Sequence, residues 1–407
     1  MRIAIVTRRY WPAIGGVERV AMNLGETLAA RGHEVRVIAQ CVDEGRFGRM
    51  THIIRENQRF APFQHDGVNV VQFRPTRPRR TLLLPFALEL IPLMGRLSQR
   101  RLRRHSAAYY AAVVEPVLSP LLAGVDVVHV LGGEVMAYAA VRAAARAGIP
   151  SAISPFAHPG DWGFDSGSIR AYREADAVIA TTRADAAVYR GAGVDPARLR
   201  VVALPVPPIV RRAAAGDPLP VPDGAPLVVF LGARRPTKGV ELLLAAAPHV
   251  WARHPETRFA FVGPGDPLGS ADARILDVGR VEDDERGRWL ARAQLLCLPS
   301  SSESFGMVVG EAWSESVPVV VSDIPVLREL VEDSGGGLVA ARTEHALAEA
   351  ISSLLADPGE ARSRGARGQQ FWRSQLAPEA VCDRHLEIYE ELLPVNPRAA
   401  SQTPPAR

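Results

Sequence analysis

The stretch LVVFLGARRPTKGVELLLAAAP, residues 227–248, decides the fold of this 407-residue chain. Its first part is a short apolar run typical of a strand buried on both faces, and its second part has the apolar spacing of a helix. Gly232, two arginines and Lys238 lie in the turn between them. Because this strand-then-helix order recurs along the chain, we expect an α/β fold of two doubly wound, Rossmann-like domains facing a central cleft.

Thirteen apolar runs predict the strands of these two domains. The first set gives an N-terminal domain over 1–205, and a proline-rich linker over 206–226 follows it. The second set gives a C-terminal domain over 227–375, then a helix over 376–393 that could cross back to the first domain, and a disordered tail over 394–407. The predicted strands are 2–7, 34–40, 68–73, 126–130, 151–154, 177–181 and 200–204 in the first set, and 227–232, 258–263, 275–279, 295–299, 317–322 and 336–340 in the second.

Composition places the chain among ordinary soluble proteins, with 47% hydrophobic and 23% charged residues. Its three cysteines, Cys41, Cys297 and Cys382, form no CxxC pair, which argues against a disulfide framework or a zinc site. We find no signal peptide and no apolar run long enough to span a membrane. A cytoplasmic protein is therefore expected, with no nucleic acid as partner.

The small net charge hides an uneven distribution. Residues 1–205 carry 27 arginines and 17 acids, whereas 206–407 carry the remaining 21 basic and 27 acidic residues. The segment 74–104 alone has nine arginines and one glutamate around an apolar centre. Such a segment can lie at the surface of an anionic membrane, which would place the protein peripherally at the inner face, or it can be a helix whose arginines are simply solvated. The two readings have about equal weight.

Lys238 is the only lysine among the 48 basic residues. A flexible ammonium beside a helix start is a phosphate-binding device that acts as a point charge, where arginine would impose a planar fork. The plain alternative is a solvated residue, although the helix dipole disfavours a cation at that end. Gly15-Gly16 marks a similar strand-to-helix turn, which is either an anion site or an ordinary tight turn.

Two acids eight residues apart flank another predicted helix start. Glu303 lies in the loop after the strand at 295–299, Glu311 lies in the helix, and Gly306 stands between them. Glu311 lies about five residues into the helix and so roughly 7–8 Å along its axis from the loop that carries Glu303, which fits the carboxyl pair of a retaining glycosidase poorly. Binding of hydroxyls on two different sugar rings fits better, although Glu303 could be a surface acid. Two phosphate-binding helix starts and two hydroxyl-binding acids together favour a sugar nucleotide as ligand.

These motifs resemble glycosyltransferase family 4, retaining enzymes of the GT-B architecture. The resemblance runs from GGVERV through ADAVIATTRADAAVYRGAGVDPARLRVV, GARRPTKGVELLLAAAP and FVGPGDP to VPVVVSDIPVLRELVEDSGGGLV. It implies that Lys238 and a nearby arginine neutralise the donor diphosphate, that Glu311 holds the ribose and that Glu303 holds the transferred sugar. The resemblance implies catalytic roles for His158, Arg234, Lys238 and Glu303, and donor contacts for Gly15, Gly16, Gly232, Arg234, Lys238, Gly263, Glu303, Ser304, Phe305, Gly306, Met307, Val308 and Glu311.

Three departures from the family pattern bear on the site. Ala233 stands where the family usually has arginine, so Arg234 or Arg235 must take over, and we favour Arg234. Glu315-Ser316 replaces small residues, and LPVPP replaces the usual Asn-Gly near 203. His129, within a predicted strand, competes with His158 as the reaction-centre histidine, but its strand position favours a core residue.

We therefore expect a retaining glycosyltransferase that moves a sugar from a nucleoside diphosphate sugar, its co-substrate, to a lipid, glycan or small-metabolite acceptor. No D-x-D motif is present, so neither a metal nor another cofactor is expected at the diphosphate. The alternatives are a sugar-nucleotide isomerase or phosphorylase on the same fold and a non-catalytic sugar-nucleotide-binding protein.

Overall fold

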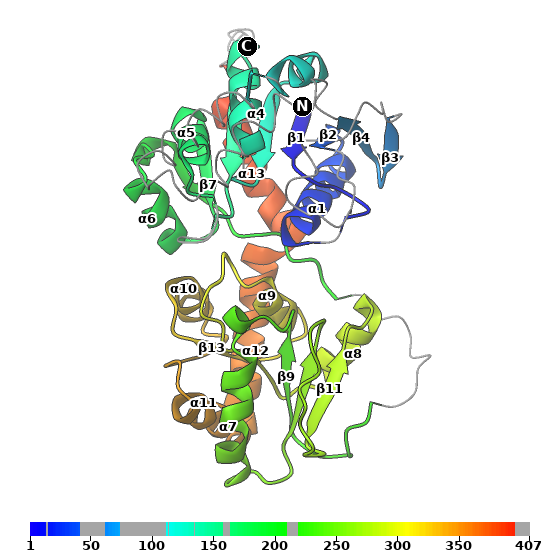
Figure 1. Cartoon of the computed structure of the whole chain (residues 1–407), viewed down its shortest axis with the longest axis vertical. Helices are drawn as coiled ribbons and strands as arrows, with labels where there is room; N and C mark the ends of the chain where they lie inside the picture. Colours follow the sequence, from blue (N-terminus) through cyan, green and yellow to red (C-terminus); the bar gives the residue numbers. More distant parts are fainter. Residues whose placement is uncertain are drawn as a thin grey trace, which may run out of the picture. The chain divides into compact units, whose positions relative to one another are not determined.

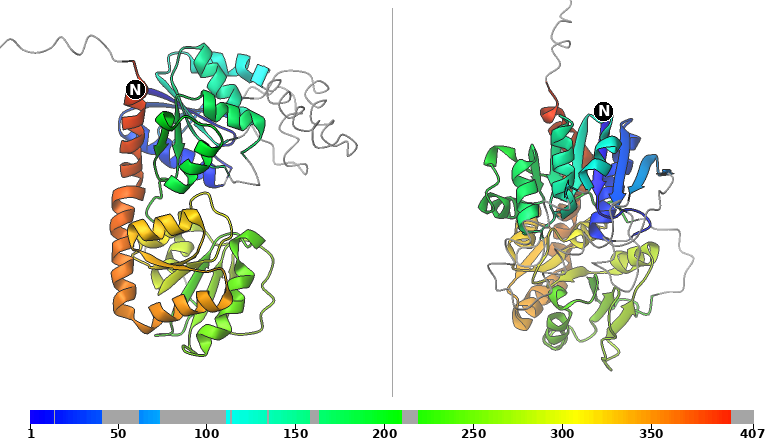
Figure 2. Two further views of the ribbon diagram at one scale, coloured as in Figure 1. Left: turned by 90° about the vertical axis from the view of Figure 1, so that its left-hand side faces the viewer. Right: turned by 45° about the horizontal axis from the view of Figure 1, so that its top comes forward.

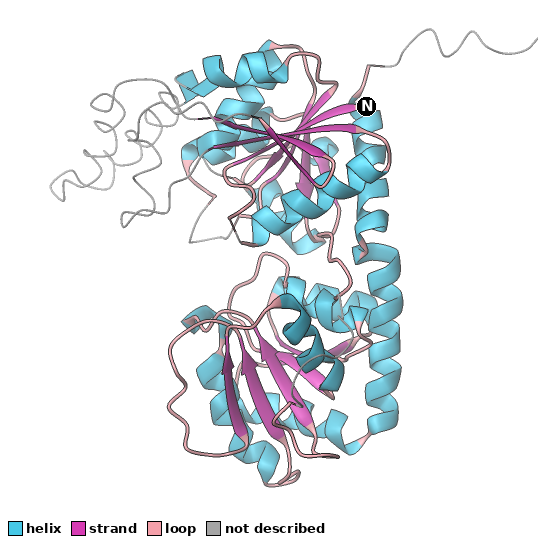
Figure 3. Cartoon of the chain, turned by 90° about the vertical axis from the view of Figure 1, so that its right-hand side faces the viewer, coloured by secondary structure: helices cyan, strands magenta, loops and turns pink. Residues whose placement is uncertain are grey.

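The computed structural model describes residues 1–13, 15–40, 62–73, 111–112, 114–133, 135–157, 163–209 and 219–394. The chain forms two compact units. The first comprises 1–180, 188–202 and the chain from Cys382 on, and the second comprises 181–187 and 203–381. Figure 1 labels many elements of both units, and Figure 3 shows the strands of each unit as one layer with helices packed against it.

The first unit is built on an eight-stranded sheet of order β3-β4-β2-β1-β5-β6-β7-β8. All neighbouring strands are parallel except β3 and β4, which form a short antiparallel hairpin. The elements from β1 to β8 are, in chain order, β1 (Arg2–Thr7), α1 (Gly16–Ala30), β2 (Glu34–Gln40), β3 (Phe63–His65), β4 (Val68–Phe73), η3 (Ser119–Leu122), β5 (Val127–Leu131), α4 (Val135–Arg146), β6 (Ser151–Ser154), α5 (Ser166–Glu174), β7 (Ala177–Ala180), α6 (Arg183–Gly191), η4 (Pro196–Arg198) and β8 (Leu199–Val201). The first residues of α6, up to 187, belong to the second unit.

The second unit has a six-stranded parallel sheet of order β11-β10-β9-β12-β13-β14. Its order reverses between β9 and β12, and such a switch point is where open α/β sheets bind ligands. The elements are β9 (Leu227–Leu231), η5 (Pro236–Lys238), α7 (Val240–Trp251), β10 (Arg258–Val262), β11 (Ile275–Gly279), α8 (Asp283–Arg292), β12 (Leu295–Leu298), α9 (Met307–Ser314), β13 (Val319–Ser322), α10 (Pro325–Ser334), β14 (Gly337–Ala340), α11 (Glu344–Ala356), α12 (Pro358–Phe371) and η6 (Trp372–Leu376). The last helix, α13 (Pro378–Leu392), begins in this unit and belongs to the first unit from Cys382 on.

The doubly wound α/β fold expected from the sequence is confirmed in each unit. Every residue of β9 is buried, because α7 and α11 pack on the sheet around Val228 and Phe230. Two details differ from expectation. The hairpin strand β3 was not predicted, and the last strand of the first sheet is β8 at 199–201 rather than 200–204. Within the described residues, no helix combines the length and the hydropathy needed to cross a bilayer.

From Cys382 on, α13 (the red helix in Figure 2) belongs to the first unit. A buried polar cluster packs this part of the helix against β5. His129 in β5 is fully buried, as its strand position suggested, and contacts the Tyr389 hydroxyl through Nδ1 at 2.6 Å and the Ser154 hydroxyl through Nε2 at 2.9 Å. The ring of His385 lies 5.3 Å from that of His129. Burial, and then the proximity of His385, hold the pKa of His129 well below its usual value.

This depressed pKa predicts a loss of stability in acid. The unfolded chain binds a proton at His129 near pH 6.5 and the folded chain does not, so the contribution is complete above that pH and is lost as the pH falls. Between pH 7.5 and 5.5 the His129→Gln variant should lose about 1 kcal/mol less unfolding free energy than the parent, since one group changes it by at most about 1.4 kcal/mol per pH unit. Urea denaturation at both pH values measures this. Parallel losses in parent and variant would contradict it, and His254→Gln in the second unit is the control.

Candidate functional site

Glycines shape the carboxyl end of β9. Gly232 has φ +148°, and its N–H donates to the carbonyl of Val262 at 2.9 Å. A Cβ added to Gly263 would meet the Gly232 carbonyl oxygen at 2.1 Å, so the chains leaving β9 and β10 approach as closely as backbone allows. The sequence nominated both residues as donor-binding. In the structure they allow the backbone after β9 and the backbone after β10 to pack against each other.

Gly239 brings the chain after β9 against the chain after β12. It adopts a left-handed conformation with φ 72°, and a Cβ there would meet the carbonyl oxygen of Pro299 at 2.3 Å. The N–H of Ser301 also donates to the carbonyl of Thr237 at 2.8 Å. Lys238, the last residue of η5, is therefore held beside the loop that carries Glu303.

Lys238 and Glu303 form an ion pair at this point. Lys238 Nζ lies 2.6 Å from Glu303 Oε1, and the Ser300 hydroxyl donates to the same oxygen at 2.7 Å. The Glu303 side chain is only 8% exposed and that of Lys238 is 27% exposed. The sequence nominated both residues for different parts of a ligand, and the structure places them in direct contact. A ligand that engages either group therefore alters the charge balance of the other.

The start of α9 lies in the same loop. Gly306 caps the helix with φ 92°, and a Cβ there would come within 2.7 Å of Leu327 Cδ2, so only glycine fits. Phe305 is buried beside it. The backbone N–H groups of Met307 and Val308 belong to the first turn, which has no carbonyls within the helix to bind them. Together with the preceding Ser304, these residues form the helix start that the sequence predicted.

Glu311 lies further along α9 and is buried. Its Oε1 faces Arg286 of α8, whose guanidinium NH2 group is 3.5 Å away and also lies 3.3 Å from Asp283. Arg286 was not identified from the sequence. The sequence of α8 is rich in acidic residues and contains no motif that singles out this arginine. Its contact with Glu311 arises only from the packing of α8 and α9 in the folded protein.

Arg234, which we favoured over Arg235 from the sequence, is paired within the second unit. Its side chain is 5% exposed and is paired with Asp277 of β11, and its guanidinium also donates to the carbonyls of Asp266 at 3.0 Å and Phe261 at 3.1 Å. Burial alone would raise the pKa of Asp277, but hydrogen bonds from the Leu268 N–H and from Arg234 lower it on balance, so this carboxylate stays charged. The Arg234 charge is thus neutralised within the protein, whereas Arg235 is exposed.

The first unit carries the other nominated glycines. Gly15 caps α1, and Glu18 of the first turn folds back so closely that a Cβ on Gly15 would clash with its carboxylate. Glu18 is buried and lies 2.5 Å from Arg9 Nε. The helix start at Gly15-Gly16 therefore already has a carboxylate beside it, together with an arginine that could meet an anion. His158 lies outside the described residues, as does the segment 74–104.

Comparison with known proteins agrees with this architecture. The model of the glycosyl transferase 4-like domain matches residues 15–205, and that of the group 1 glycosyl transferases matches residues 225–357. D-inositol 3-phosphate glycosyltransferase of Xylanimonas cellulosilytica is 29% identical over 59% of this chain and 63% of its own length. Phosphatidyl-myo-inositol mannosyltransferase of Mycolicibacterium smegmatis is 33% identical over 34% of this chain and 39% of its own length. The chain thus spans less than two thirds of these relatives.

Solved structures match the whole fold at low sequence identity. Sucrose-phosphate synthase from Thermosynechococcus elongatus superposes with a TM-score of 0.68 at 19% identity, covering 98% of this chain and 100% of that one. Anabaena Alr3699/HepE, in complex with UDP and glucose, gives a TM-score of 0.66 at 17% identity, covering 96% and 100%. The chain belongs to the GT-B glycosyltransferases, with a glycosyl transferase 4-like domain in its first half and a group 1 glycosyl transferase domain in its second.

Proposed function

We propose that this protein transfers a sugar from a nucleoside diphosphate sugar to an acceptor hydroxyl with retention of anomeric configuration. The observation that carries the proposal is the switch point of the second sheet, where Lys238 follows β9 and Glu303 and Gly306 follow β12. An ammonium, a carboxylate and a helix start at the ends of two neighbouring strands suit a ligand with both phosphates and sugar hydroxyls. Family membership and the UDP-bound Anabaena structure support the same ligand class.

In the proposed reaction the C1–O bond to the diphosphate breaks and a bond from C1 to the acceptor oxygen forms on the same face. The acceptor proton passes to an oxygen of the leaving phosphate, so no separate protein base is required. Lys238 and the amides at the start of α9 stabilise the charge that develops on the diphosphate, because they are already oriented before the reaction. Arg235 replaces Arg234 as the proposed second cation, since Arg234 is paired with Asp277. No metal takes part in the proposed step.

The test has two steps that separate this function from its alternatives. Nucleoside diphosphates are first screened by thermal shift, because a ligand at 100 times its Kd stabilises by about 2.7 kcal/mol. The matching sugar nucleotide is then incubated with and without acceptor, and the anomeric configuration of the product is read by NMR. Conversion of the donor alone into another sugar nucleotide would indicate an isomerase, and binding without any turnover would indicate a sensor. Either result overturns the proposal.

The acceptor panel should begin with inositol phosphates, soluble and lipid-linked. The relatives are named for D-inositol 3-phosphate and phosphatidyl-myo-inositol, which share a phosphorylated polyol but differ in whether a lipid carries it. Transfer of the sugar to the soluble compound alone would identify a soluble acceptor, and transfer to the lipid alone would identify a lipid acceptor.

Residues 74–104 provide the prediction that bears on the lipid alternative. Their nine arginines should add roughly 1 kcal/mol each against an anionic leaflet if they face it. We expect the protein to sediment with phosphatidylglycerol vesicles at low salt, to be released at high salt, and not to bind phosphatidylcholine vesicles. Replacing Arg100, Arg101, Arg103 and Arg104 with glutamine should reduce the pelleted fraction. Absence of pelleting at low salt would favour a soluble acceptor.

A further inference from the structure

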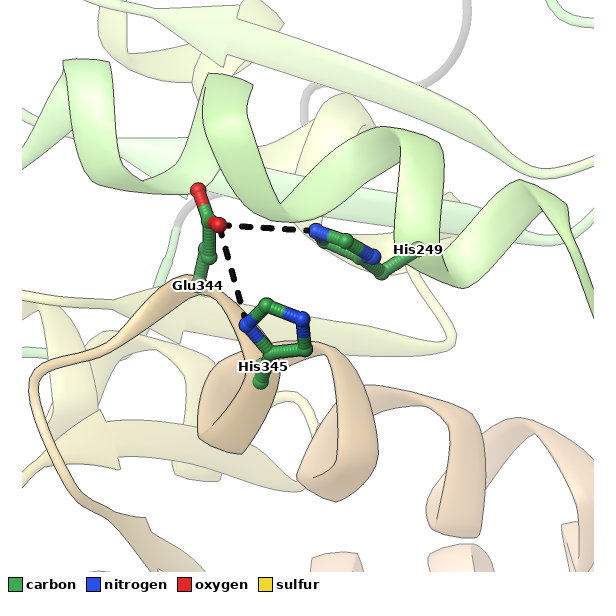
Figure 4. A group of neighbouring side chains, drawn as sticks. All are labelled: His249, Glu344 and His345. Carbon is green, nitrogen blue, oxygen red and sulfur yellow. Dashed lines mark ion pairs between the residues drawn. The ribbon is translucent and has the colours of Figure 1, made fainter.

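Two histidines and a glutamate meet where the last turn of α7 passes the first turn of α11 (Figure 4). His249 comes from α7, and Glu344 and His345 come from α11. Both histidines point toward the same carboxylate oxygen, Glu344 Oε1. Their rings are 4.2 Å apart between centroids and tilted by 37°. This cluster lies away from the candidate site around Lys238 and Glu303, since His249 is about 14 Å along the helix axis from Val240 at the start of α7.

The spacing of the three polar atoms favours a shared ion over direct hydrogen bonds. His249 Nε2 lies 3.7 Å and His345 Nδ1 lies 3.6 Å from Glu344 Oε1, and the three potential ligand atoms all fall within 4.8 Å of one another. Hydrogen bonds from nitrogen to oxygen measure about 2.7–3.2 Å, so these contacts are too long. Ligands of a tetrahedral zinc ion, with bonds near 2.0–2.1 Å, stand about 3.4 Å apart. The two distances from the histidine nitrogens to Glu344 Oε1 are close to that value.

We propose that His249, Glu344 and His345 bind a zinc ion or a similar borderline transition metal. Two imidazoles and one carboxylate form an established zinc ligand set, whereas magnesium and calcium prefer oxygen ligands alone. His249 is 41%, Glu344 43% and His345 74% exposed, so an ion can enter from solvent and water can fill the fourth position. His345 adjoins Glu344 in sequence, so only the approach of α7 is needed to complete the site.

The bound ion would fasten α7 to α11. The two helices share the core of the second unit through side chains such as Leu243 and Leu347. Just beyond the end of α7, Arg253 pairs with Glu349 of α11 at 2.7 Å, so an all-protein ion pair already joins this region to α11. A metal adds a second cross-link at the end of this interface, and it stabilises the folded state because the unfolded chain does not hold the ligands together.

A second group of metal-ligating side chains provides the comparison. Glu26, His65 and Asp66 in the first unit also lie close together, with His65 Nδ1 3.5 Å from Asp66 and 4.0 Å from Glu26. This group has one imidazole instead of two. Burial, and then the neighbouring Asp66, raise the pKa of Glu26, which favours a proton on that carboxyl. The group therefore suits zinc less well and serves as a built-in control.

The experiment is a zinc titration of the full, chelator-treated chain by calorimetry, with a thermal-shift series in parallel. We expect one zinc per chain and a rise in Tm of roughly 5 °C at 100 times the Kd. His345→Ala should weaken binding at least about tenfold, because loss even of a residue supporting a ligand costs about 10–100-fold. The double variant His249→Ala, His345→Ala should abolish the binding. His65→Ala and Glu349→Gln should leave it unchanged.

Cobalt substitution gives an independent readout, because tetrahedral Co²⁺ has intense visible bands that report its ligands directly. Glu344→Gln, which keeps the side-chain shape, serves if the double variant folds poorly, and it should lose the bands as well. Absence of stoichiometric zinc binding by the parent, or binding that survives the double variant, overturns the proposal. No sugar nucleotide is used, so the outcome is independent of the proposed transferase activity.

Discussion

Replacing Lys238 with alanine should lower kcat/KM, with donor affinity and turnover falling together. The fall should correspond to a loss of about 2–4 kcal/mol in transition-state stabilisation. The ammonium is the one lysine charge of the chain, and it lies at the sheet's switch point beside the start of α9. A group that stabilises charge developing on a leaving diphosphate contributes more in the transition state than in the ground state. Steady-state kinetics with the donor found by the nucleotide screen measures the effect. Lys238→Arg should rescue only part of the loss, because a planar fork replaces a point charge.

The ion pair with Glu303 complicates the reading of that variant and also provides its control. Lys238→Ala leaves a carboxylate that is only 8% exposed without its cation, although the Ser300 hydroxyl still donates to it. Part of the measured loss therefore belongs to Glu303, and a double-mutant cycle with Glu303→Gln separates the two contributions. Residues in direct contact couple by about 0.5–3 kcal/mol, so the double variant should lose less than the sum of the singles.

A second ion pair, away from the site, tests whether the loss of kcat/KM in Lys238→Ala comes from the position of the lysine or from the loss of any paired cation. Arg253→Ala removes a cation that is paired with Glu349 just beyond the end of α7, and it should leave kcat/KM unchanged. If Lys238→Ala transfers sugar at the parent rate, the lysine is incidental to the reaction and the proposed electrostatic role is wrong.

The strands were predictable because parallel strands buried on both faces leave nearly continuous apolar runs, as in residues 2–7 and 227–231. The hairpin strand β3 leaves no such run. It contains Phe63, Gln64 and His65, and only the Asp66-Gly67 turn to β4 signals it. Short edge strands of this kind depend on their partner rather than on their own sequence.

The residues of the candidate site were found more readily than their contacts. Lys238 and Glu303 are 65 positions apart, and they meet because β9 and β12 are neighbours in the sheet, which no local pattern encodes. The same limit explains Arg234. The run Ala-Arg-Arg does not say which guanidinium turns toward Asp277, 43 residues later on β11. Partners supplied by another strand or helix require the fold itself.

The second prediction separates the two glutamates by ligand. Glu311→Gln should weaken binding of the free nucleoside diphosphate and of the full donor alike, by about 1.5–3 kcal/mol, the range for hydrogen bonds to a charged group. The proposed reason is that its carboxylate, oriented by Arg286 at 3.5 Å, accepts hydrogen bonds from ribose hydroxyls, which both ligands carry. Arg286→Ala should then weaken both ligands in the same direction. Calorimetry with each ligand measures these affinities.

Glu303→Gln should affect the affinities for the nucleoside diphosphate and for the sugar nucleotide differently. The nucleoside diphosphate lacks the transferred sugar that this carboxylate is proposed to bind, and loss of the Glu303 charge releases the Lys238 ammonium from its 2.6 Å ion pair. The variant should therefore bind the nucleoside diphosphate at least as tightly as the parent, while its affinity for the sugar nucleotide falls. A stronger affinity for the product-like ligand together with a weaker affinity for the donor cannot arise from general damage to the fold, which would weaken both. Equal losses for both ligands in both glutamate variants would contradict the division of roles between ribose and transferred sugar.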